Sequence, residues 1–317
     1  MDFSEHNLDE ELEYENSDLV EEDTSLAETT NSNFNAEASN ADSIENHLLV
    51  NGRPKKGNRK VVVISGASSG IGKEILSMFL HAGHAVVNLS RSNPDNYKGH
   101  IKCDVGCLES IEEAVAEIKE KFGRVDILIN NAGIGISGAT EMLPDAEVVR
   151  VMDIDYMGAL RLSRLCLPLM DKNAKIVNIS SACAIFPLPF RGVYCSAKAA
   201  MNMLSYSMRM ELSRFGIKVV TICPGEIKTD FTANRLKFAK TNEKYGESPI
   251  KSALAIDEKN DERMPAKVAA KKIYKICANK KGTLYIIGAK YKFFYFAQKM
   301  LPTSWFNSII NKLFNKK

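Results

Sequence analysis

Acidic side chains are missing from the C-terminal part of this 317-residue chain, and basic side chains are missing from its N-terminal part. Residues 1–50 hold 15 Asp and Glu with no Lys or Arg, whereas no acidic residue follows Glu262. An acidic segment rich in Ser and Asn, without a sustained apolar period, cannot bury a core. We therefore expect residues 1–58 to be a disordered segment and linker, which either aids solubility or screens the basic C-terminal end.

Long apolar runs and paired cysteines are also missing. No stretch of about 18 apolar residues exists to span a bilayer, and no signal peptide is expected because neither a basic n-region nor an apolar core opens the chain. The seven scattered cysteines do not form a disulfide framework. Cys103 and Cys107 have no second Cys or His pair nearby, so no metal site is expected. A reducing, cytoplasmic compartment fits this pattern best.

From residue 61 onward, short apolar runs alternate with segments of helical periodicity. The predicted strands are Val61–Ile64, Ala85–Leu89, Val125–Ile129, Lys175–Ile179, Lys218–Ile222 and Thr283–Ile287. The predicted helices between them include residues 108–122, 146–170, 192–214 and 265–278. The alternation implies a Rossmann-type, doubly wound parallel sheet in a single α/β domain, residues 59–289. Residues 231–262 are charged and weakly periodic, so a mobile insertion is expected there.

Three glycines, Gly66, Gly70 and Gly72, lie between the first predicted strand and a helical period that runs to Leu80. Glycine lets the backbone turn tightly and lets a pyrophosphate approach the helix N-terminus, where free amides and the helix dipole favour anions. A tight structural turn is the alternative. Because the glycines stand between a buried strand and an amphipathic helix, nucleotide binding is favoured.

The second strand ends at Ser90 and Arg91, where the dinucleotide fingerprint normally has an acidic residue for the ribose diol. An arginine there suits a 2′-phosphate, so NADPH is favoured over NADH, with a solvated loop charge as the alternative. After the next strand, Asp104 and Val105 are expected at the adenine edge, unless Asp104 simply caps the helix that begins near Leu108.

Asn130–Gly133 directly follow the predicted strand Val125–Ile129. Small and amide residues at the carboxyl end of a strand belong where a ligand crosses the crevice of a parallel sheet. The same four residues are also good turn chemistry.

A tyrosine and a lysine stand one helical turn apart at Tyr194 and Lys198, with Ser181 thirteen positions upstream. A tyrosine is a poor acid–base catalyst alone because its pKa lies near ~10. A lysine on the same helix face favours the phenolate, and the serine hydroxyl could hold a carbonyl oxygen beside it. Such a group moves a proton on and off an alcohol oxygen. The spacing alone is not decisive, since Tyr295 and Lys299 repeat it on an aromatic, basic helix face.

Residues 60–288 resemble the short-chain dehydrogenase/reductase family, with five motifs in that family's order and spacing. The matches are, in chain order, the glycine motif Ser65–Gly72 (with Ser65 where threonine is commoner), Asn130–Gly133, the serine Ser181, the pair Tyr194 and Lys198, and the Pro-Gly stretch Pro224–Thr229.

The resemblance implies a role for each of these residues. Tyr194 is the general acid in carbonyl reduction and the base in alcohol oxidation. Lys198 holds the nicotinamide ribose and depresses the tyrosine pKa, and Ser181 orients the substrate oxygen. The residues expected to contact the dinucleotide are Gly66, Ser68, Ser69, Gly70, Ile71, Gly72, Arg91, Asp104, Val105, Asn131, Ala132, Gly133, Tyr194, Lys198, Pro224, Gly225, Ile227 and Thr229.

One position departs from the family pattern. The fourth catalytic residue is usually an asparagine three residues before a glycine, and here these positions are Asp155 and Gly158. An aspartate could still hold the water bound to Lys198. As an anion it would also compete for the influence of the ammonium on Tyr194, which leaves a second interpretation open: a catalytically weakened regulatory protein that keeps the fold and binds nucleotide.

The sequence says less about the substrate than about the cofactor. Ala184–Phe190 lies between Ser181 and Tyr194 and should line an apolar pocket, unless it is ordinary core. With the 231–262 insertion it suggests a hydrophobic carbonyl or secondary alcohol, lipid-like or steroid-like. Cys195 is either oxidisable or a small buried residue. The resemblance also implies a homo-oligomer formed through the helices 146–170 and 192–214.

Residues 290–317 form a basic, aromatic tail that reads as two short helices, Lys290–Pro302 and Trp305–Phe314. Aromatic and apolar residues with lysine and no acid suit an interfacial segment on an anionic membrane surface, which would make the protein peripherally attached. The alternatives are that the aromatics cover the pocket or pack between subunits. No nucleic-acid recognition module is visible, so no nucleic-acid partner is expected.

Overall fold

The structure is a computed structural model that describes residues 49–50, 53–54, 59–258 and 263–314. The acidic segment predicted to be disordered lies outside these residues, apart from two short strands in its last part. These are Leu49–Val50 (β1) and Arg53–Pro54 (β2), which pair as an antiparallel ribbon. This part of the predicted linker therefore has secondary structure.

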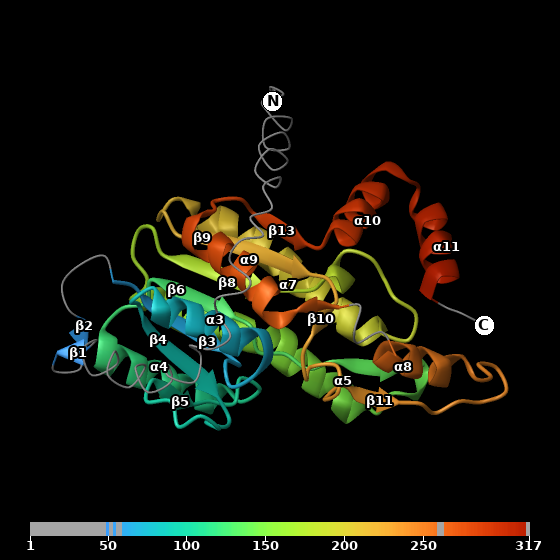
Figure 1. The fold of residues 1–317 in the computed structure, drawn as a ribbon, viewed down its shortest axis with the longest axis horizontal. Helices are drawn as coiled ribbons and strands as arrows, with labels where there is room; N and C mark the ends of the chain where they lie inside the picture. Colours follow the sequence, from blue (N-terminus) through green and yellow to red (C-terminus); the bar gives the residue numbers. More distant parts are fainter. Residues whose placement is uncertain (1–48, 51–52, 55–58, 259–262, 315–317) are drawn as a thin grey trace, which may run out of the picture. The chain divides into compact units, whose positions relative to one another are not determined.

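Seven parallel strands form the central sheet, in the spatial order β13-β9-β8-β6-β3-β4-β5 (Figure 1). Their bounds are Val61–Ser65 (β3), Ala85–Ser90 (β4), His100–Lys102 (β5), Ile127–Asn130 (β6), Lys175–Ile179 (β8), Lys218–Pro224 (β9) and Leu284–Ile287 (β13). The chain builds outward from β3 to β5, returns to β6 beside β3, and continues to β13. The predicted Rossmann-type sheet is confirmed, and its switch point lies between β3 and β6.

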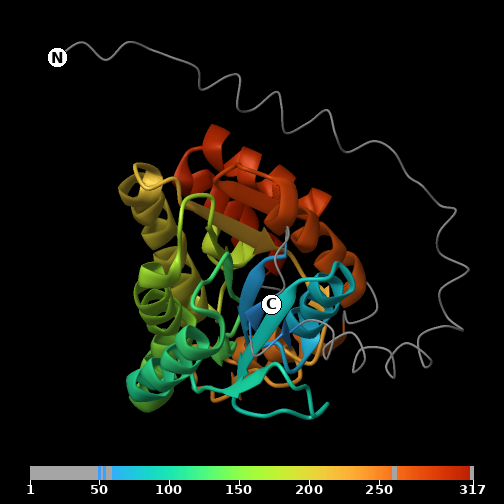
Figure 2. The ribbon, with the colours of Figure 1, turned by 90° about the vertical axis from the view of Figure 1, so that its left-hand side faces the viewer.

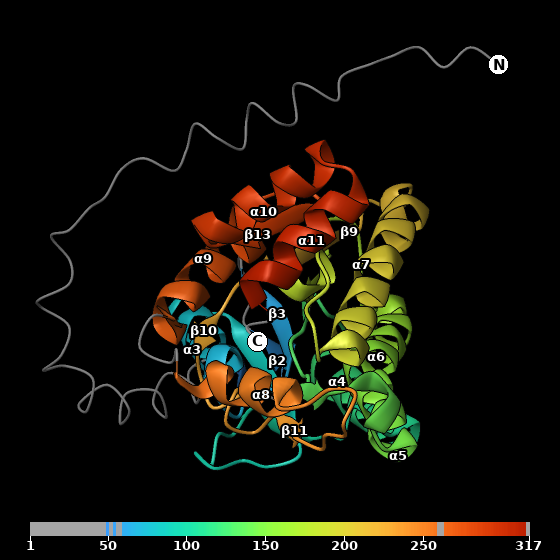
Figure 3. The same ribbon diagram turned by 90° about the vertical axis from the view of Figure 1, so that its right-hand side faces the viewer.

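Two layers of helices enclose this sheet, because alternate strand residues point to opposite faces. Gly70–His81 (α3) and Ala266–Asn279 (α9) share a buried cluster with Val62 and Ile64. The opposite face is covered by Leu108–Phe122 (α4), Gly158–Cys166 (α6) and Gly192–Ser213 (α7), which pack with the intervening residues such as Val63 and Val87. Figure 2 and Figure 3 show the two layers on either side of the strands.

The predicted helix 146–170 is divided into four consecutive parts. It begins as Asp145–Met152 (α5), passes through a π-helical turn at Asp153–Met157 (η3), continues as α6 and ends in a 3-10 turn at Leu167–Leu169 (η4). A π-turn inserts one extra residue and rotates the positions that follow, and such turns are frequent at functional sites. Here the turn contains Asp155, which is fully buried.

The segment expected to be a mobile insertion contains regular elements. Leu236–Phe238 (β11) pairs in parallel with Ile136–Gly138 (β7), which is followed by the 3-10 turn Thr140–Met142 (η2). Ser248–Glu258 (α8) follows β11, and Ile227–Lys228 (β10) pairs with Met264–Pro265 (β12). The sequence did not reveal β11 because its three residues gain their hydrogen bonds from a strand about a hundred positions away.

The tail forms the two helices predicted for it, Ala289–Met300 (α10) and Thr303–Phe314 (α11), with Pro302 between them. The pair stands at one end of the sheet, beyond β13 (Figure 1). Phe294 and Phe306 are buried with Phe186 in one aromatic cluster, in which ring centroids of Phe186 and Phe294 lie 5.3 Å apart. The tail is therefore packed onto the segment that precedes Tyr194.

Candidate active site

A cavity of about 370 Å³ opens where the carboxyl ends of the strands meet. All residues predicted for the site line it except Gly72 and Asp155. The structure thus brings together the glycine-rich turn, the end of β4, the Asn-Asn-Ala-Gly segment, the Tyr194 group and the Pro-Gly stretch, which lie as much as 163 positions apart in the chain. A nicotinamide dinucleotide needs a site that spans these elements.

The glycine-rich turn leaves space for a phosphate at the start of α3. Gly66 and Gly70 have positive φ values of +69° and +57°, which only glycine adopts without strain. A Cβ on Gly66 would stand 2.9 Å from the Ala132 backbone. Ser69, the N-cap residue, makes no side-chain capping bond, so the first amides of α3 keep their hydrogen-bonding capacity. Free amides and a helix dipole suit a pyrophosphate, so this part of the site fits the predicted cofactor.

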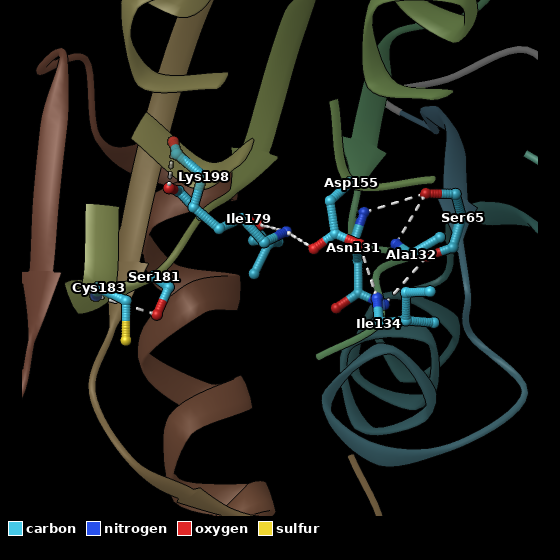
Figure 4. A network of polar contacts seen from close by, with 10 residues as sticks. Ser65, Asn131, Ala132, Ile134, Asp155, Ile179, Ser181, Cys183 and Lys198 are labelled. Carbon is cyan, nitrogen blue, oxygen red and sulfur yellow. Dashed lines mark hydrogen bonds and ion pairs between the residues drawn. The ribbon is translucent and has the colours of Figure 1, made fainter. Parts of the chain in front are cut away.

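The turn is fastened to the Asn-Asn-Ala-Gly segment by hydrogen bonds (Figure 4). The Ser65 hydroxyl accepts from the backbone N–H groups of Asn131 and Ala132, each at 3.0 Å. The Asn131 amide donates to the carbonyls of Ser65 and Gly66, also at 3.0 Å. Gly72 completes the packing, since a Cβ there would lie 2.4 Å from the Gly66 carbonyl oxygen. Gly72 therefore acts through packing and does not line the cavity.

Asn130 lies directly below the site and faces away from the cavity. Its amide donates to Asn178 Oδ1 at 2.7 Å and to Ser163 Oγ at 3.0 Å, and the Asn178 amide donates to Ser205 Oγ at 2.7 Å. These buried side chains join β6, β8, α6 and α7. The network holds the strand ends in register beneath the reacting groups.

At the far end of the cavity, Arg91 is exposed at the end of β4 and Asp104 is partly buried after β5. Asp104 Oδ1 accepts from the Gly106 N–H at 3.0 Å, whereas Cys107 is the N-cap residue of α4. The alternative in which Asp104 caps that helix is therefore wrong. Its carboxylate stabilises the local turn and stays on the wall of the cavity.

Tyr194 and Lys198 lie on the first turns of α7 and are both buried, at 7% and 3% exposure. The Lys198 ammonium lies 5.9 Å from the centre of the Tyr194 ring. Ser181 caps the 3-10 turn Ala182–Ala184 (η5), where its hydroxyl accepts from the Cys183 N–H, and it stands close enough to Tyr194 to lower the pKa of that phenol. The structure therefore brings the three predicted reacting side chains together at one wall of the cavity.

The protein around Tyr194 holds its phenol in the protonated form. Burial raises the pKa of Tyr194, and the charges of Cys183 and Asp155 raise it further, while Ser181 and Arg235 oppose them. A phenol that keeps its proton is ready to donate it to a carbonyl oxygen.

Asp155 contacts Lys198 directly. Its Oδ2 lies 3.2 Å from the Lys198 ammonium, and its Oδ1 accepts from the Ile134 N–H at 2.7 Å (Figure 4). Lys198 also donates to the Ile179 carbonyl at 3.4 Å. Burial raises the pKa of Asp155, opposed by the Lys198 charge and the Ile134 hydrogen bond. The Asp155 carboxylate thus contacts Lys198 without lining the cavity. Its negative charge offsets part of the positive charge that Lys198 would otherwise exert on Tyr194.

The structure adds residues that the sequence patterns did not indicate. Three arginines, a cysteine and two tail aromatics also line the cavity: Arg191, Arg235, Arg263, Cys183, Tyr291 and Phe314. Tyr291 packs on Gly225 so closely that a Cβ there would stand 1.9 Å from the ring. No sequence pattern pointed to the arginines or to Cys183, and the sequence left the tail aromatics open among a membrane surface, the pocket and a contact between subunits.

The second tyrosine–lysine pair, Tyr295 and Lys299, lies on α10 and does not line the cavity. The Lys299 ammonium stands 4.6 Å from the centre of the Tyr295 ring. This pair is an aromatic, basic helix face, as the sequence suggested. Cys195 is buried at 7% exposure and packs with Phe186, in agreement with a small core residue.

No group of three or more His, Cys, Asp and Glu side chains is placed to hold a metal ion within residues 59–258 and 263–314. Over the same residues, no helix has the length and apolar character needed to cross a bilayer.

A parallel sheet with an anion-binding turn and a tyrosine, lysine and serine at its crevice defines a class, the Rossmann-fold oxidoreductases. A family model described as short chain dehydrogenase matches residues 60–240, more than half of the chain. The chain belongs to the short-chain dehydrogenase/reductase family. This family binds NAD(H) or NADP(H) and acts on CH–OH groups and the corresponding carbonyls.

Individual relatives agree with this membership. A 3-ketodihydrosphingosine reductase of Bacteroides thetaiotaomicron is 36% identical over 229 residues, which cover 70% of this chain and 84% of that protein. A probable short-chain type dehydrogenase/reductase of Helicobacter pylori is 30% identical over 78% of this chain and 96% of that protein. The solved structure of a short-chain dehydrogenase from Streptomyces avermitilis has a TM-score of 0.68 and 26% identity, over 78% of this chain and 94% of that one.

Proposed function

We propose that this protein is an NADP(H)-dependent reductase of a hydrophobic ketone, or the dehydrogenase of the corresponding secondary alcohol. The observation that carries the proposal is the position of Tyr194, Lys198 and Ser181 on the wall of a cavity that begins at the glycine-rich turn. When bound, the dinucleotide supplies or accepts the hydride. Reduction then consumes one carbonyl, one hydride and one proton, and yields one alcohol.

The side chains of the chain handle the proton and the orientation. The Ser181 hydroxyl donates a hydrogen bond to the substrate oxygen, and the Tyr194 phenol gives its proton to the same oxygen as the carbonyl carbon is reduced. Lys198 binds the ribose next to the nicotinamide and offsets the negative charge that remains on the phenolate. Burial of Tyr194 excludes water from this transfer.

The preference for NADP(H) rests on the end of β4. Arg91 is exposed on the cavity wall, and its neighbours Ser90 and Ser92 offer hydroxyls and no carboxylate. A guanidinium can bind a 2′-phosphate through paired, charge-assisted hydrogen bonds. Arg91→Ala should raise the KM for NADPH by about tenfold or more and leave that for NADH nearly unchanged. Equal effects on both cofactors would contradict the preference.

The substrate is proposed to be lipid-like. The wall opposite the glycine-rich turn carries Phe186, Leu188, Phe231, Tyr291 and Phe314, which give an apolar lining. The relative from Bacteroides thetaiotaomicron is named for a keto form of a sphingoid base, which is a lipid-like substrate. Both observations favour a carbonyl on an alkyl chain over a small polar one.

The direct test measures NADPH oxidation with a panel of long-chain ketones, for the parent protein and for Tyr194→Phe. The variant keeps the ring and removes only the proton donor, so kcat should fall by about a hundredfold or more while NADPH still binds. Cofactor binding without turnover in the parent protein would instead support the regulatory interpretation, for which the Asp155–Lys198 ion pair is the specific observation.

The tail is proposed to contact an anionic membrane surface. Beside the aromatic side chains that are buried, α10 and α11 expose Phe293, Phe296, Met300, Trp305, Ile309 and Leu313, each at 44–68%. Lysines flank them and no acidic residue occurs in either helix. Exposed apolar side chains with cations suit the headgroup region of an anionic bilayer. The inner side of the tail covers the pocket, so the two interpretations of its aromatics apply to opposite faces.

Sedimentation with vesicles tests this contact. The full chain should pellet with vesicles that contain phosphatidylglycerol and remain in the supernatant with phosphatidylcholine alone. Phe296→Ser/Trp305→Ser should abolish pelleting, whereas Phe215→Ser, which removes an aromatic side chain exposed at 53% elsewhere, should not. Pelleting of the double variant at the parent level would contradict the proposal.

A homo-oligomer is proposed through α7. Met203 and Met210 lie two turns apart on this helix and are exposed at 66% and 71%. Their spacing puts both on one helix face, which a second copy could cover. Sedimentation velocity should show a larger species for the parent protein and a monomer for Met203→Lys/Met210→Lys; a monomeric parent protein would overturn the proposal.

A further inference from the structure

Arg235 is a half-buried cation on the wall of the cavity, and its Nη1 atom is buried. It directly precedes β11, and the Leu236 N–H donates to the Gly135 carbonyl at 2.9 Å, so its backbone is held against the Asn-Asn-Ala-Gly segment. Its side chain crosses Gly135, where a Cβ would lie 2.8 Å from the Arg235 Nε. The guanidinium therefore occupies a fixed place beside the reacting groups.

Within the described part of the chain, this guanidinium has no counter-ion. Among the described residues, Arg235 has no ion pair, and its buried Nη1 has no hydrogen-bond partner. A buried guanidinium nitrogen without a partner is costly, because it has lost its hydration and gained nothing in exchange. A ligand oxygen that accepted a hydrogen bond from Nη1 would remove this cost.

Two further arginines increase the positive charge at this end of the cavity. Arg191 and Arg263 are near enough to lower the pKa of Arg235, after burial as the larger cause, to about 10, so it remains charged at neutral pH. Arg263 is buried and donates to Thr232 Oγ1 at 3.1 Å. The acidic residues that line the described cavity are Asp104, at the dinucleotide end, and Glu226, whose charge raises the pKa of Tyr291, after burial as the larger cause.

The neighbours of Arg235 place it on the substrate side. Its charge acts on Tyr194 and on Cys183, and the same would-be Cβ of Gly135 that meets Arg235 also meets Phe231 at 3.3 Å. Phe231 in turn packs 6.0 Å from the Tyr194 ring, centre to centre. A molecule whose carbonyl oxygen reached Tyr194 and Ser181 would therefore extend past the Arg235 guanidinium.

We propose that Arg235, assisted by Arg191, forms an oxyanion subsite that selects ketones with a carboxylate or phosphate close to the carbonyl, and rejects those with an ammonium group there. The inference rests on the proposed reductase function and names its substrate class: an anionic, long-chain ketone. The guanidinium binds two oxygens of the anion through its fork, while the alkyl chain lies against the aromatic wall.

Matched ketones test the subsite. One set is a long-chain oxo acid, its primary amide and the matching amino ketone; a second is a long-chain hydroxy ketone and its phosphate monoester. The parent protein should give a higher kcat/KM for the carboxylate or the phosphate than for the neutral partner, and the lowest value for the ammonium. The set with the larger ratio identifies the type of oxyanion.

Variants then assign the preference to Arg235. Arg235→Met should lower kcat/KM for the anionic ketone by about 10- to 100-fold, and change the value for the amide by less than about threefold. Arg235→Lys keeps the positive charge but lacks the two-pronged guanidinium. Its kcat/KM for the anionic ketone should lie between the values of the parent protein and of Arg235→Met. Arg214→Met, which removes an arginine that does not line the cavity, is the control and should behave as the parent protein does.

Gly135→Ala gives an independent test, because it leaves the charge in place and displaces it. The new methyl group would force the Arg235 side chain to move, and the anion preference should fall while the amide is still reduced. An unchanged head-group preference in Arg235→Met would overturn the subsite even if turnover persists. A rise in the KM for NADPH without a change in that preference would also overturn it, by assigning the guanidinium to the cofactor. Loss of all turnover in the parent protein would instead count against the reductase function.

Discussion

The carboxylate of Asp155 faces the ammonium of Lys198 across 3.2 Å, with 0% and 4% of the two side chains exposed. Without water to screen it, the carboxylate neutralises much of the field that Lys198 would exert on Tyr194. It also raises the pKa of Tyr194 directly, after burial and the charge of Cys183. The proposed reduction uses the phenol form of Tyr194, which this arrangement favours.

Asp155→Asn should shift the pH profile in a defined direction. Removal of the carboxylate lowers the pKa of Tyr194, so alcohol oxidation, which needs the phenolate, rises at lower pH than in the parent protein. Each unit of that shift changes the phenolate fraction by about tenfold below the pKa. Carbonyl reduction should correspondingly begin to decline at lower pH. Rate profiles in both directions over the alkaline range check this, and unchanged profiles would make Asp155 a passive substitute.

Cys183 is the second residue with altered acidity. The neighbouring Cys195 is the main cause that lowers the pKa of Cys183, opposed by burial, and this favours the thiolate of Cys183. Its side chain is partly exposed on the cavity wall, whereas Cys103, Cys166, Cys195, Cys223 and Cys277 are buried. Iodoacetamide at pH 7 should therefore modify Cys183 before these buried cysteines, and a bound ketone should slow the reaction. Peptide mass spectrometry gives the order in which the cysteines are labelled, and Cys183→Ser is the control. Faster labelling of Cys223 than of Cys183 would contradict the prediction that Cys183 is the more reactive thiol.

At the scale of elements, the glycine-rich turn depends on its neighbour β6. The Ser65 hydroxyl is the acceptor for two backbone N–H groups, so Ser65→Ala should cost about 1–3 kcal/mol of unfolding free energy. The turn would loosen where the dinucleotide binds, and cofactor affinity should fall together with thermal stability. Ser65→Thr keeps the hydroxyl and should preserve both. A stable Ser65→Ala variant with parent cofactor affinity would contradict this role.

The docking of α10 rests on one buried ring. Phe294 is 8% exposed against Phe186, whereas its neighbour Phe293 is 66% exposed. Phe294→Ala should therefore destabilise the protein by roughly 3 kcal/mol, and Phe293→Ala by less than about 0.5 kcal/mol. Thermal unfolding should show the first as a clear drop in Tm and the second as almost none. Equal effects of the two would show that α10 does not dock through Phe294.

At the scale of the whole molecule, a dinucleotide bound in the cavity would contact elements from both halves of the sheet and would stabilise the folded state by mass action. At about 100 times its dissociation constant, a ligand adds roughly 2.7 kcal/mol to unfolding. NADPH should therefore raise Tm by several degrees, and by more than NADH at the same concentration if Arg91 binds the 2′-phosphate. Differential scanning fluorimetry of the full chain measures both. A larger shift with NADH would reverse the cofactor assignment.

The parts of the fold that the sequence predicted are those with local patterns. Val61–Ile64 reads as a buried strand from its own composition, and the glycines and the pair Tyr194 and Lys198 are set by spacings of a few residues. Arg235 could not be found in this way, because its place depends on β11 pairing with β7. Tyr291 reaches Gly225 across 66 positions of sequence, which no periodicity records. The residues expected at the dinucleotide end of the cavity were thus predictable from the sequence, and those at the substrate end, such as Arg235 and Tyr291, were not.

The two faces of the tail have a consequence for how the rate would be measured. Tyr291 and Phe314 form part of the cavity wall, while Trp305 and Phe296 point outward from the same two helices. A bilayer that holds the outer face would place the cavity mouth within reach of lipid that never enters the aqueous phase. The substrate would then arrive by lateral diffusion in two dimensions. Turnover should follow the mole fraction of ketone in the membrane, and dilution of the vesicles at constant composition should leave the rate per bound protein unchanged.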